Sequence, residues 1–268
     1  MKRRETAYFL LTLMLRQLIH PATNWLDSPT PRRVSAVALI TCAGLAAYGF
    51  SVGYWRSALM GGYVAVKMPL LIACTLGCNG LLNGLLGILL GTGLGFRQSL
   101  LALLTSFALA ALILGSLAPV TWWLAWNAPV PNSSGAAQAH AFYVVAHTFL
   151  IGFAGITANL HLHRLLTAEA ANPTAATVTL LAWLSGNCFL GAQFSWILRP
   201  FFGCPSLEVA FLRPDPLRGN FYQSVWRSLE SITGGYGLLA LIFILALLFI
   251  PIARAIQTTH HSPAINPR

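Results

Sequence analysis

Six apolar runs of about 20 residues dominate this chain of 268 residues. A helix of about 20 residues crosses the roughly 30 Å hydrocarbon core of a bilayer. None of the runs contains Asp or Glu, and Lys and Arg lie only at their edges. The runs cover approximately residues 34–54, 68–92, 99–119, 140–160, 176–198 and 233–253. Because lipid cannot satisfy exposed backbone groups, we predict an all-α integral membrane helical bundle with about six transmembrane helices.

The amino-acid composition also indicates that lipid surrounds most of the chain. Hydrophobic residues make up 56% of the chain and charged residues only 8%, whereas roughly a quarter of the residues are charged in soluble domains. The net charge of +10 would suggest nucleic acid for a soluble protein, but the basic residues lie mostly between the apolar runs. Lys and Arg in such positions fix membrane orientation. We therefore expect the lipid bilayer, and not nucleic acid, as a partner.

Three regions are predicted along the chain. Residues 1–33 form an N-terminal segment that begins MKRRETAYFLLTLMLRQLIHP. Its start resembles a signal peptide, but the apolar run is short and no small-residue cleavage site follows. We expect an interfacial amphipathic helix over about residues 6–19. Residues 34–253 form the transmembrane domain, with a membrane-lying cap at 199–232, and residues 254–268 form a tail.

The ends of some helices can be predicted from local signals. Lys67 and Pro69 are expected to open the second helix, and the three tryptophans at 122, 123 and 126 are expected to form an aromatic belt after the third. The Pro, Ser, Asn and Ala residues of 120–139 indicate a polar loop. Asn172 and Pro173 are a plausible cap and first position of the fifth helix.

Charge counts do not decide the orientation. With six simple crossings the N-terminus is cytoplasmic, and ten of the sixteen Lys and Arg residues lie on that side. If run 68–92 broke near Asn79 and returned to the side on which it began, ten basic residues would again lie on the cytoplasmic side and six on the other. We favour six crossings, because this run has the length of one slightly tilted helix and the uncharged loop is easily translocated.

Glycine recurs every three or four residues in GCNGLLNGLLGILLGTGLG, residues 77–95. The positions are Gly77, Gly80, Gly84, Gly87, Gly91 and Gly95. This spacing places them on one side of a helix, where the missing side chains allow another helix to approach closely. We predict a helix-packing face, turned toward another part of the chain or toward a partner. A pore or substrate groove lined by bare backbone is the alternative.

Polar side chains near this stripe form a candidate membrane site. Asn79 and Asn83 lie beside the stripe, and the fifth run contributes Asn187, Gln193 and Ser195. Such groups usually form interhelical hydrogen bonds worth about 1 kcal/mol, although a site for a polar ligand or an ion is the alternative. We expect the polar face of the fifth run to meet the glycine stripe.

His140 and His147 share one face of the fourth predicted helix. A haem bound by two histidines within one chain needs its second ligand on a different helix, but the other histidines lie outside the runs. His161 and His163 are expected just beyond the end of this helix, where solvated side chains are the simpler interpretation. We therefore predict no cofactor and no metal, while a haem or pigment at a subunit interface is left open.

The fifth run ends in QFSWILRPFFG, where Pro200 stops the helix and leaves Arg199 at the boundary. Arg199 is expected to reach a lipid phosphate or to pair with a carboxylate. Arg213 and Arg218 are further candidates for contact with lipid or a partner. All six acidic residues lie outside the runs, which argues against proton-coupled carriers and intramembrane metalloenzymes. No catalytic motif is present, so an enzyme is not predicted.

Three stretches carry a resemblance to known proteins. They are AVKMPLL at 65–71, FSWILRPFFGCP at 194–205 and GNFYQSVW at 219–226. Together they resemble a group of uncharacterised bacterial polytopic membrane proteins that is loosely similar to Yip1-like integral membrane proteins. The resemblance implies the fold and a multi-pass location in the cell membrane, here a bacterial inner membrane. It implies no reaction and no catalytic residue.

The leading hypothesis for function is a non-enzymatic subunit or scaffold of a membrane complex, assembled with other membrane subunits or as a homo-oligomer. The first alternative is a small channel or carrier whose pathway lies between the second and fifth helices. The second alternative is a subunit that holds a haem or pigment through His140 and His147.

Overall fold

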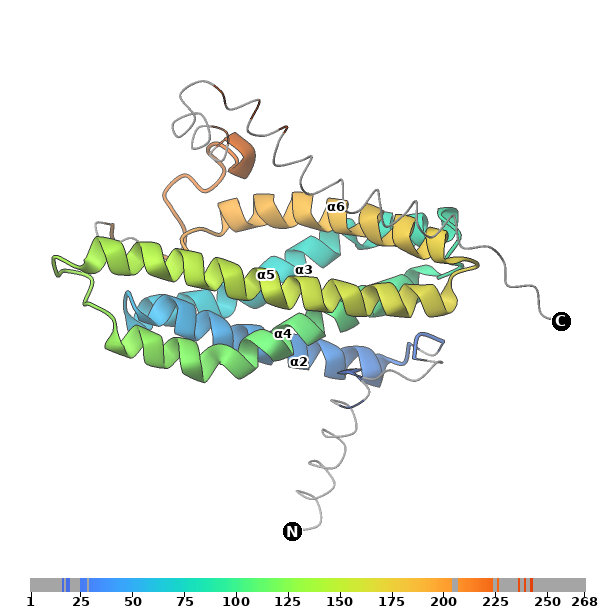
Figure 1. Cartoon of the computed structure of the whole chain (residues 1–268), viewed down its shortest axis with the longest axis horizontal. Coiled ribbons are helices and arrows are strands. Elements are labelled where there is room, and N and C mark those ends of the chain that lie inside the picture. Colours follow the sequence, from blue (N-terminus) through green and yellow to red (C-terminus); the bar gives the residue numbers. More distant parts are fainter. Residues whose placement is uncertain are drawn as a thin grey trace, which may run out of the picture.

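The computed structural model describes residues 16, 18–19, 25–27, 29–203, 207–223, 226, 236, 239 and 242. This part of the chain contains five long helices and no strand (Figure 1). They are α2 (Pro31–Tyr54), α3 (Ala58–Leu89), α4 (Phe96–Asn127), α5 (Ala136–Glu169) and α6 (Pro173–Ile197). All five are long and apolar enough to cross a membrane. The predicted all-α membrane helical bundle is confirmed.

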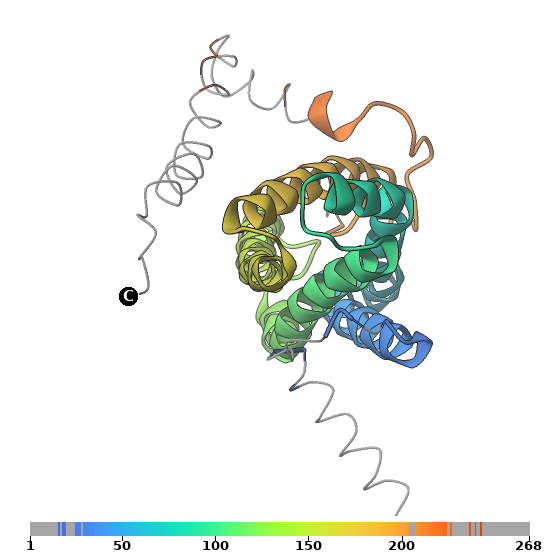
Figure 2. The ribbon, with the colours of Figure 1, turned by 90° about the vertical axis from the view of Figure 1, so that its right-hand side faces the viewer.

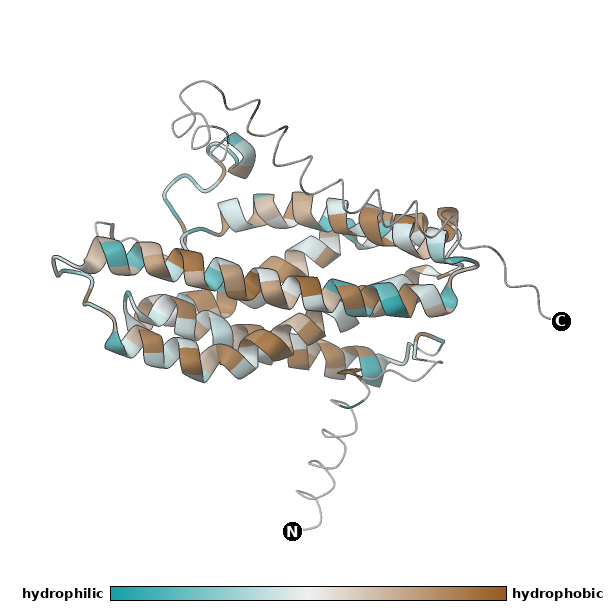
Figure 3. Ribbon diagram, viewed as in Figure 1, coloured by the Kyte–Doolittle hydropathy of each residue, from teal (hydrophilic) through white to brown (hydrophobic). Residues whose placement is uncertain are grey.

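The helices run side by side along the long axis of the bundle, and short connections make each one antiparallel to the next (Figures 1 and 2). Hydrophobic residues extend along their length, and the most hydrophilic residues lie mainly near the helix ends (Figure 3). This distribution matches a bundle whose middle is surrounded by hydrocarbon. The predicted N-terminal helix and sixth span lie almost entirely outside the described residues.

The predicted start of the second helix is wrong. Helix α3 begins at Ala58, where the Ser57 side chain accepts a hydrogen bond from the backbone N–H of Met60. Lys67 and Pro69 therefore lie inside the helix. Helix α3 continues without a break through Asn79, so the alternative in which this run dips back is not observed.

Helices α4 and α5 also extend beyond their predicted ends. The three tryptophans at 122, 123 and 126 lie in the last turns of α4, so the predicted 120–139 loop is reduced to residues 128–135. His161 and His163 lie within α5, not beyond it. At 32 and 34 residues, these helices are about 50 Å long. Both helices are longer than the bilayer core requires. The length of an apolar run therefore underestimates the length of the helix that contains it.

The start of α6 was predicted correctly. Asn172 is the N-cap, and its side-chain Oδ1 accepts a hydrogen bond of 2.9 Å from the backbone N–H of Ala175. Pro173 follows in the first turn, where its missing N–H costs no helical hydrogen bond.

Helix α2 packs against both α3 and α4 at glycines that the sequence analysis did not single out. A Cβ atom on Gly44 would collide with the backbone carbonyl of Ala111 in α4. A Cβ atom on Gly49 would lie 2.6 Å from the carbonyl oxygen of Val64 in α3. These backbones approach closely because glycine has no side chain, and close van der Waals packing drives helix association in lipid.

We predict that Gly44→Ala destabilises the protein by about 1–3 kcal/mol, since the added methyl group overpacks a contact with backbone that cannot move easily. The matched control is Gly77→Ala in α3, where a new Cβ atom would meet nothing within 4 Å. The control should be neutral or slightly stabilising, because alanine favours helix by up to about 1 kcal/mol over glycine. Thermal unfolding in detergent, followed by circular dichroism, measures both. Equal effects of the two changes would contradict this packing.

Candidate functional site

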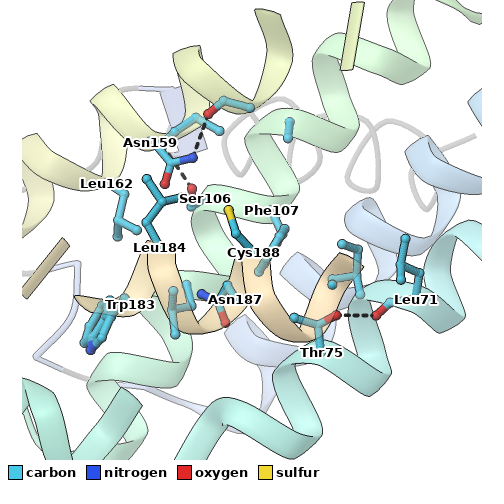
Figure 4. A pocket seen from close by; sticks show the side chains of 16 residues that line it. Leu71, Thr75, Ser106, Phe107, Asn159, Leu162, Trp183, Leu184, Asn187 and Cys188 are labelled. Atoms are coloured by element: carbon cyan, nitrogen blue, oxygen red, sulfur yellow. Dashed lines mark hydrogen bonds between the residues drawn. The ribbon is translucent and has the colours of Figure 1, made fainter. Parts of the chain in front are cut away.

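Two adjoining chambers form a cavity inside the bundle. The larger, which we call the cap chamber, has a volume of about 550 Å³ and lies at the end of the bundle where α6 ends. The smaller, the middle chamber, has a volume of about 240 Å³ and lies nearer the centre of the helices (Figure 4). Both are lined by the same five residues, Leu71, Ile72, Phe107, Ala110 and Gly155. The two chambers are therefore adjacent to each other.

The cavity reaches the outer surface of the bundle. Ile151 of α5 lines the cap chamber and is 40% exposed. Cys188 of α6 lines the middle chamber and is also exposed. Both residues lie near the middle of helices that are long and apolar enough to cross a membrane, so in a bilayer these exposed positions would face the hydrocarbon.

Residues 199–203 form one wall of the cap chamber. Phe201 and Phe202 line it, and both rings pack against a buried cluster that includes Tyr48 and Val52 of α2. The Phe202 ring centroid is 5.8 Å from that of His147 in α5. The start of the predicted cap thus enters the bundle, since its phenylalanine rings bury apolar surface there.

Lys67 of α3 is fully buried and holds this segment. Its Nζ donates a hydrogen bond of 2.7 Å to the carbonyl oxygen of Pro200. Nζ also lies 5.8 Å from the ring centroid of Phe201 and 5.1 Å from that of Phe211. Aromatic faces and a carbonyl oxygen stabilise a buried ammonium group. The described part of the chain contains no carboxylate that pairs with Lys67.

We define the cap segment as residues 199–203 and 207–223. Gly203 and Leu207 of this segment contact Arg56, which lies just before α3. Gly203 has a φ of +68°, and a Cβ atom there would lie 2.8 Å from Cγ of Arg56. Both the backbone conformation and the close approach require glycine. Arg56 Nη2 donates to the carbonyl oxygen of Leu207 at 3.1 Å.

Arg199 lies beside the cap chamber, just after α6. Its Nη1 donates to the carbonyl oxygens of Trp196, at 2.6 Å, and Pro216, at 3.3 Å. Its guanidinium carbon is 3.8 Å from the Trp196 ring centroid. Burial and the positive charge of Arg213 lower the pKa of Arg199. Among the described residues, no carboxylate forms the ion pair with Arg199 that the sequence analysis allowed.

The three candidate arginines have different surroundings in the structure. Arg213 lies between Phe211, whose ring centroid is 5.1 Å from Lys67 Nζ, and Pro216, whose carbonyl oxygen accepts from Arg199 Nη1. We call Lys67, Arg199 and Arg213 the cationic cluster. The Arg218 side chain is exposed, and only its backbone carbonyl is engaged, by Trp196 Nε1 at 3.2 Å.

Three asparagines connect α3 with α6. Asn187 Oδ1 accepts hydrogen bonds from Asn79 Nδ2, at 3.0 Å, and from Asn83 Nδ2, at 3.2 Å. Asn79 Nδ2 also donates to Asn83 Oδ1 at 3.3 Å. Trp183 Nε1 donates to the Asn83 carbonyl oxygen at 2.8 Å. Asn187 lines the middle chamber (Figure 4), so the asparagine cluster borders the cavity.

The other two residues of the candidate polar site lie elsewhere. Gln193 Oε1 accepts a hydrogen bond of 3.0 Å from the backbone N–H of Phe221, which ties the cap segment to α6. Ser195 Oγ donates to the carbonyl oxygen of Ala192 in its own helix, and Ser195 lines the cap chamber.

The glycine stripe does not form one continuous helical face. Helix α3 ends at Leu89, so Gly91, with a φ of +86°, and Gly95 lie in the connection to α4. A Cβ atom on Gly84 would lie 2.6 Å from the Phe96 ring, and one on Gly87 would lie 2.8 Å from Ser99 Oγ. Gly80 faces Leu100 in the same way, whereas Gly77 is open. The stripe's contacts therefore lie within this chain, mainly on α4, with Trp183 of α6 also 3.3 Å from a Cβ atom on Gly87.

The two candidate histidines have different surroundings. His147 Nδ1 and the Tyr48 hydroxyl share a buried hydrogen bond of 2.7 Å between α5 and α2. The His140 ring centroid lies 5.9 Å from that of Trp55. The described residues contain no group of three or more His, Cys, Asp and Glu that could hold a metal. The absence of a cofactor stays a prediction.

Sequence reasoning missed Gly155 as a cavity residue and Lys67 as the residue that holds the cavity wall at residues 199–203. The signal for Lys67 was the Ser57 cap upstream, which starts the helix early enough to carry the lysine inside it. No local signal marks Gly155, because its place depends on how α5 packs. Comparisons with known protein families, with curated proteins and with solved structures found no match to this chain.

We predict that Lys67→Met releases residues 199–203, because the buried Pro200 carbonyl loses its charged donor. A charge-assisted hydrogen bond is worth about 1.5–3 kcal/mol, so chymotrypsin should cleave after Phe201 or Phe202 roughly tenfold faster or more. Val66→Met is the matched control, since Val66 is adjacent and exposed. Mass spectrometry of the fragments measures the rates. Identical cleavage of both variants would contradict the role given to Lys67.

Proposed function

We propose that this polytopic membrane protein is a small carrier that binds a hydrophobic or amphipathic molecule of the bilayer. The observation that supports it best is the pair of adjoining chambers open at membrane depth. The larger chamber falls within the roughly 300–1,000 Å³ of small-molecule sites, which are mostly apolar with a few placed polar groups.

The position of the cavity agrees with the pathway expected between the second and fifth predicted helices, which are α3 and α6. Leu71 and Thr75 of α3 face the middle chamber together with Asn187 and Cys188 of α6 (Figure 4). The asparagine cluster supplies polar groups on one wall, and the rest of the lining is largely apolar. A molecule from the hydrocarbon can enter such a site without crossing water.

A subunit or scaffold of a membrane complex is the second candidate. Gly77 favours it, because this exposed member of the glycine stripe meets nothing within 4 Å and leaves room for a neighbouring helix. The other stripe contacts are internal, so they give a partner no surface. Native mass spectrometry of the purified protein tests this function, since a scaffold requires a stable partner or homo-oligomer.

The cell location and a haem-holding role stay predictions. In the proposed topology, α2 to α6 cross the bilayer five times, so the cap segment and Pro31 lie on opposite sides. With a cytoplasmic N-terminus, the cap segment then faces away from the cytoplasm. Labelling of a cysteine placed at residue 210 in intact cells tests this orientation.

The visible absorbance of the purified protein tests whether His140 and His147 hold a haem or pigment.

We predict that Gly155→Leu strongly reduces the amount of lipid or other small molecule that the protein retains through purification. A Cβ atom on Gly155 would meet nothing within 4 Å, and Gly155 lines both chambers, so a leucine side chain has room to extend into the cavity. Gly152→Leu is the matched control, since Gly152 is on the same helix, exposed and equally uncrowded. Native mass spectrometry measures retained molecules. Wild-type retention by Gly155→Leu would contradict the proposed function.

A further inference from the structure

The cationic cluster brings three positive charges together without a described counter-charge. Lys67 is fully buried, and Arg199 borders the cap chamber. Arg213 lies on the short stretch between Phe211, which contacts Lys67, and Pro216, which contacts Arg199. Buried charges in proteins are normally paired with an opposite charge or coordinated. Backbone carbonyl oxygens contact Lys67 and Arg199, but they carry no net negative charge. The cluster therefore suits a bound anion.

Arg199 retains donors for such an anion. A guanidinium group has five N–H donors, and the contacts to Trp196 and Pro216 use only Nη1. The Trp196 ring, 3.8 Å from the guanidinium carbon, holds the plane of the group. A planar, preoriented arginine matches the geometry of phosphate oxygens better than a lysine does.

The space next to the cluster excludes a simple water-soluble anion as the best match. The cap chamber is lined by apolar side chains such as Met68, Leu114 and Phe107, and it shares five lining residues with the middle chamber. An anion alone would leave this apolar volume empty. A molecule with a charged head and a hydrocarbon chain satisfies both parts of the site.

The depth of the cluster indicates where the charged head comes from. Helix α6 ends at Ile197, two residues before Arg199, so this arginine lies at the membrane boundary. Basic side chains at helix ends reach the level of lipid phosphates. The cap chamber also opens on the outer surface at Ile151, which gives a bilayer lipid direct access.

We propose that the ligand is an anionic phospholipid, with its phosphate at Arg199 and Arg213, an acyl chain in the two chambers, and the buried charge of Lys67 behind the adjacent wall. This inference rests on the carrier function proposed above and adds the charge of the headgroup. It assigns Arg199 and Arg213 as specificity residues. Arg218, in the same segment but exposed, has no place in the site.

The test is binding of fluorescently labelled phosphatidylglycerol and phosphatidylcholine, with the same labelled acyl chain, to the full-length protein in neutral detergent. The wild-type protein should bind the anionic lipid about tenfold more tightly, as expected for a charge-assisted contact. Arg199→Gln and Arg213→Gln should each remove most of this preference. Phosphatidylcholine carries the same phosphate next to a cationic choline, so its binding should weaken less than that of phosphatidylglycerol. Arg218→Gln is the matched control and should retain the preference.

Several outcomes would overturn the inference. One is an equal affinity of the wild-type protein for the two lipids. Another is an equal loss of preference in Arg199→Gln and Arg218→Gln, because that result would indicate an effect of diffuse surface charge. Arg213→Gln guards against misfolding, because the Arg213 side chain makes no hydrogen bond within the described residues. Gly155→Leu separates the two proposals. If it abolishes binding of both lipids while the wild type shows no preference, the cavity function stands and the headgroup assignment fails. If it changes neither, the cavity function fails.

Discussion

The hydrogen bond from Lys67 to the Pro200 carbonyl determines the shape of one end of the bundle. An ammonium group inside a membrane helix is costly unless it finds partners, and here the partners are a backbone carbonyl and two phenylalanine rings of the cap segment. The same contact places Phe201 and Phe202 against the core and leaves Arg199 beside the cap chamber. The wall of the cavity and its charged border therefore depend on one buried cation.

The bundle combines close backbone contacts with a cavity. Glycines bring the backbone of α2 into contact with α3 and α4 at Gly44 and Gly49. On the other side, α3 and α6 meet through the larger amide groups of Asn79, Asn83 and Asn187. Polar side chains link these two helices, and Asn187 lines the middle chamber. A binding site in lipid requires such a difference, since uniform close packing leaves no cavity.

Much of the fold could be predicted from run length and local signals. Apolar runs identified the five described helices, and the Asn172 cap was correctly placed because capping depends only on neighbouring residues. Helix ends were less predictable: α3 begins ten residues before its apolar run, and Gly91 leaves the helix with a positive φ. Of the candidate site, spacing pointed to the three asparagines but not to Lys67 or Gly155. Their roles depend on residues more than a hundred positions away or on another helix.

The amino-acid sequence by itself determined that this chain is a helical membrane protein, because twenty uncharged apolar residues in a row are stable in hydrocarbon only as a helix. It also determined where polar amides and arginines occur along the helices. Only the tertiary structure decided that the glycine stripe packs mostly inside the chain, that Lys67 is buried against Pro200, and that two chambers lie between the five helices. These features arise from the relative rotation and separation of helices, which side-chain contacts between distant segments set.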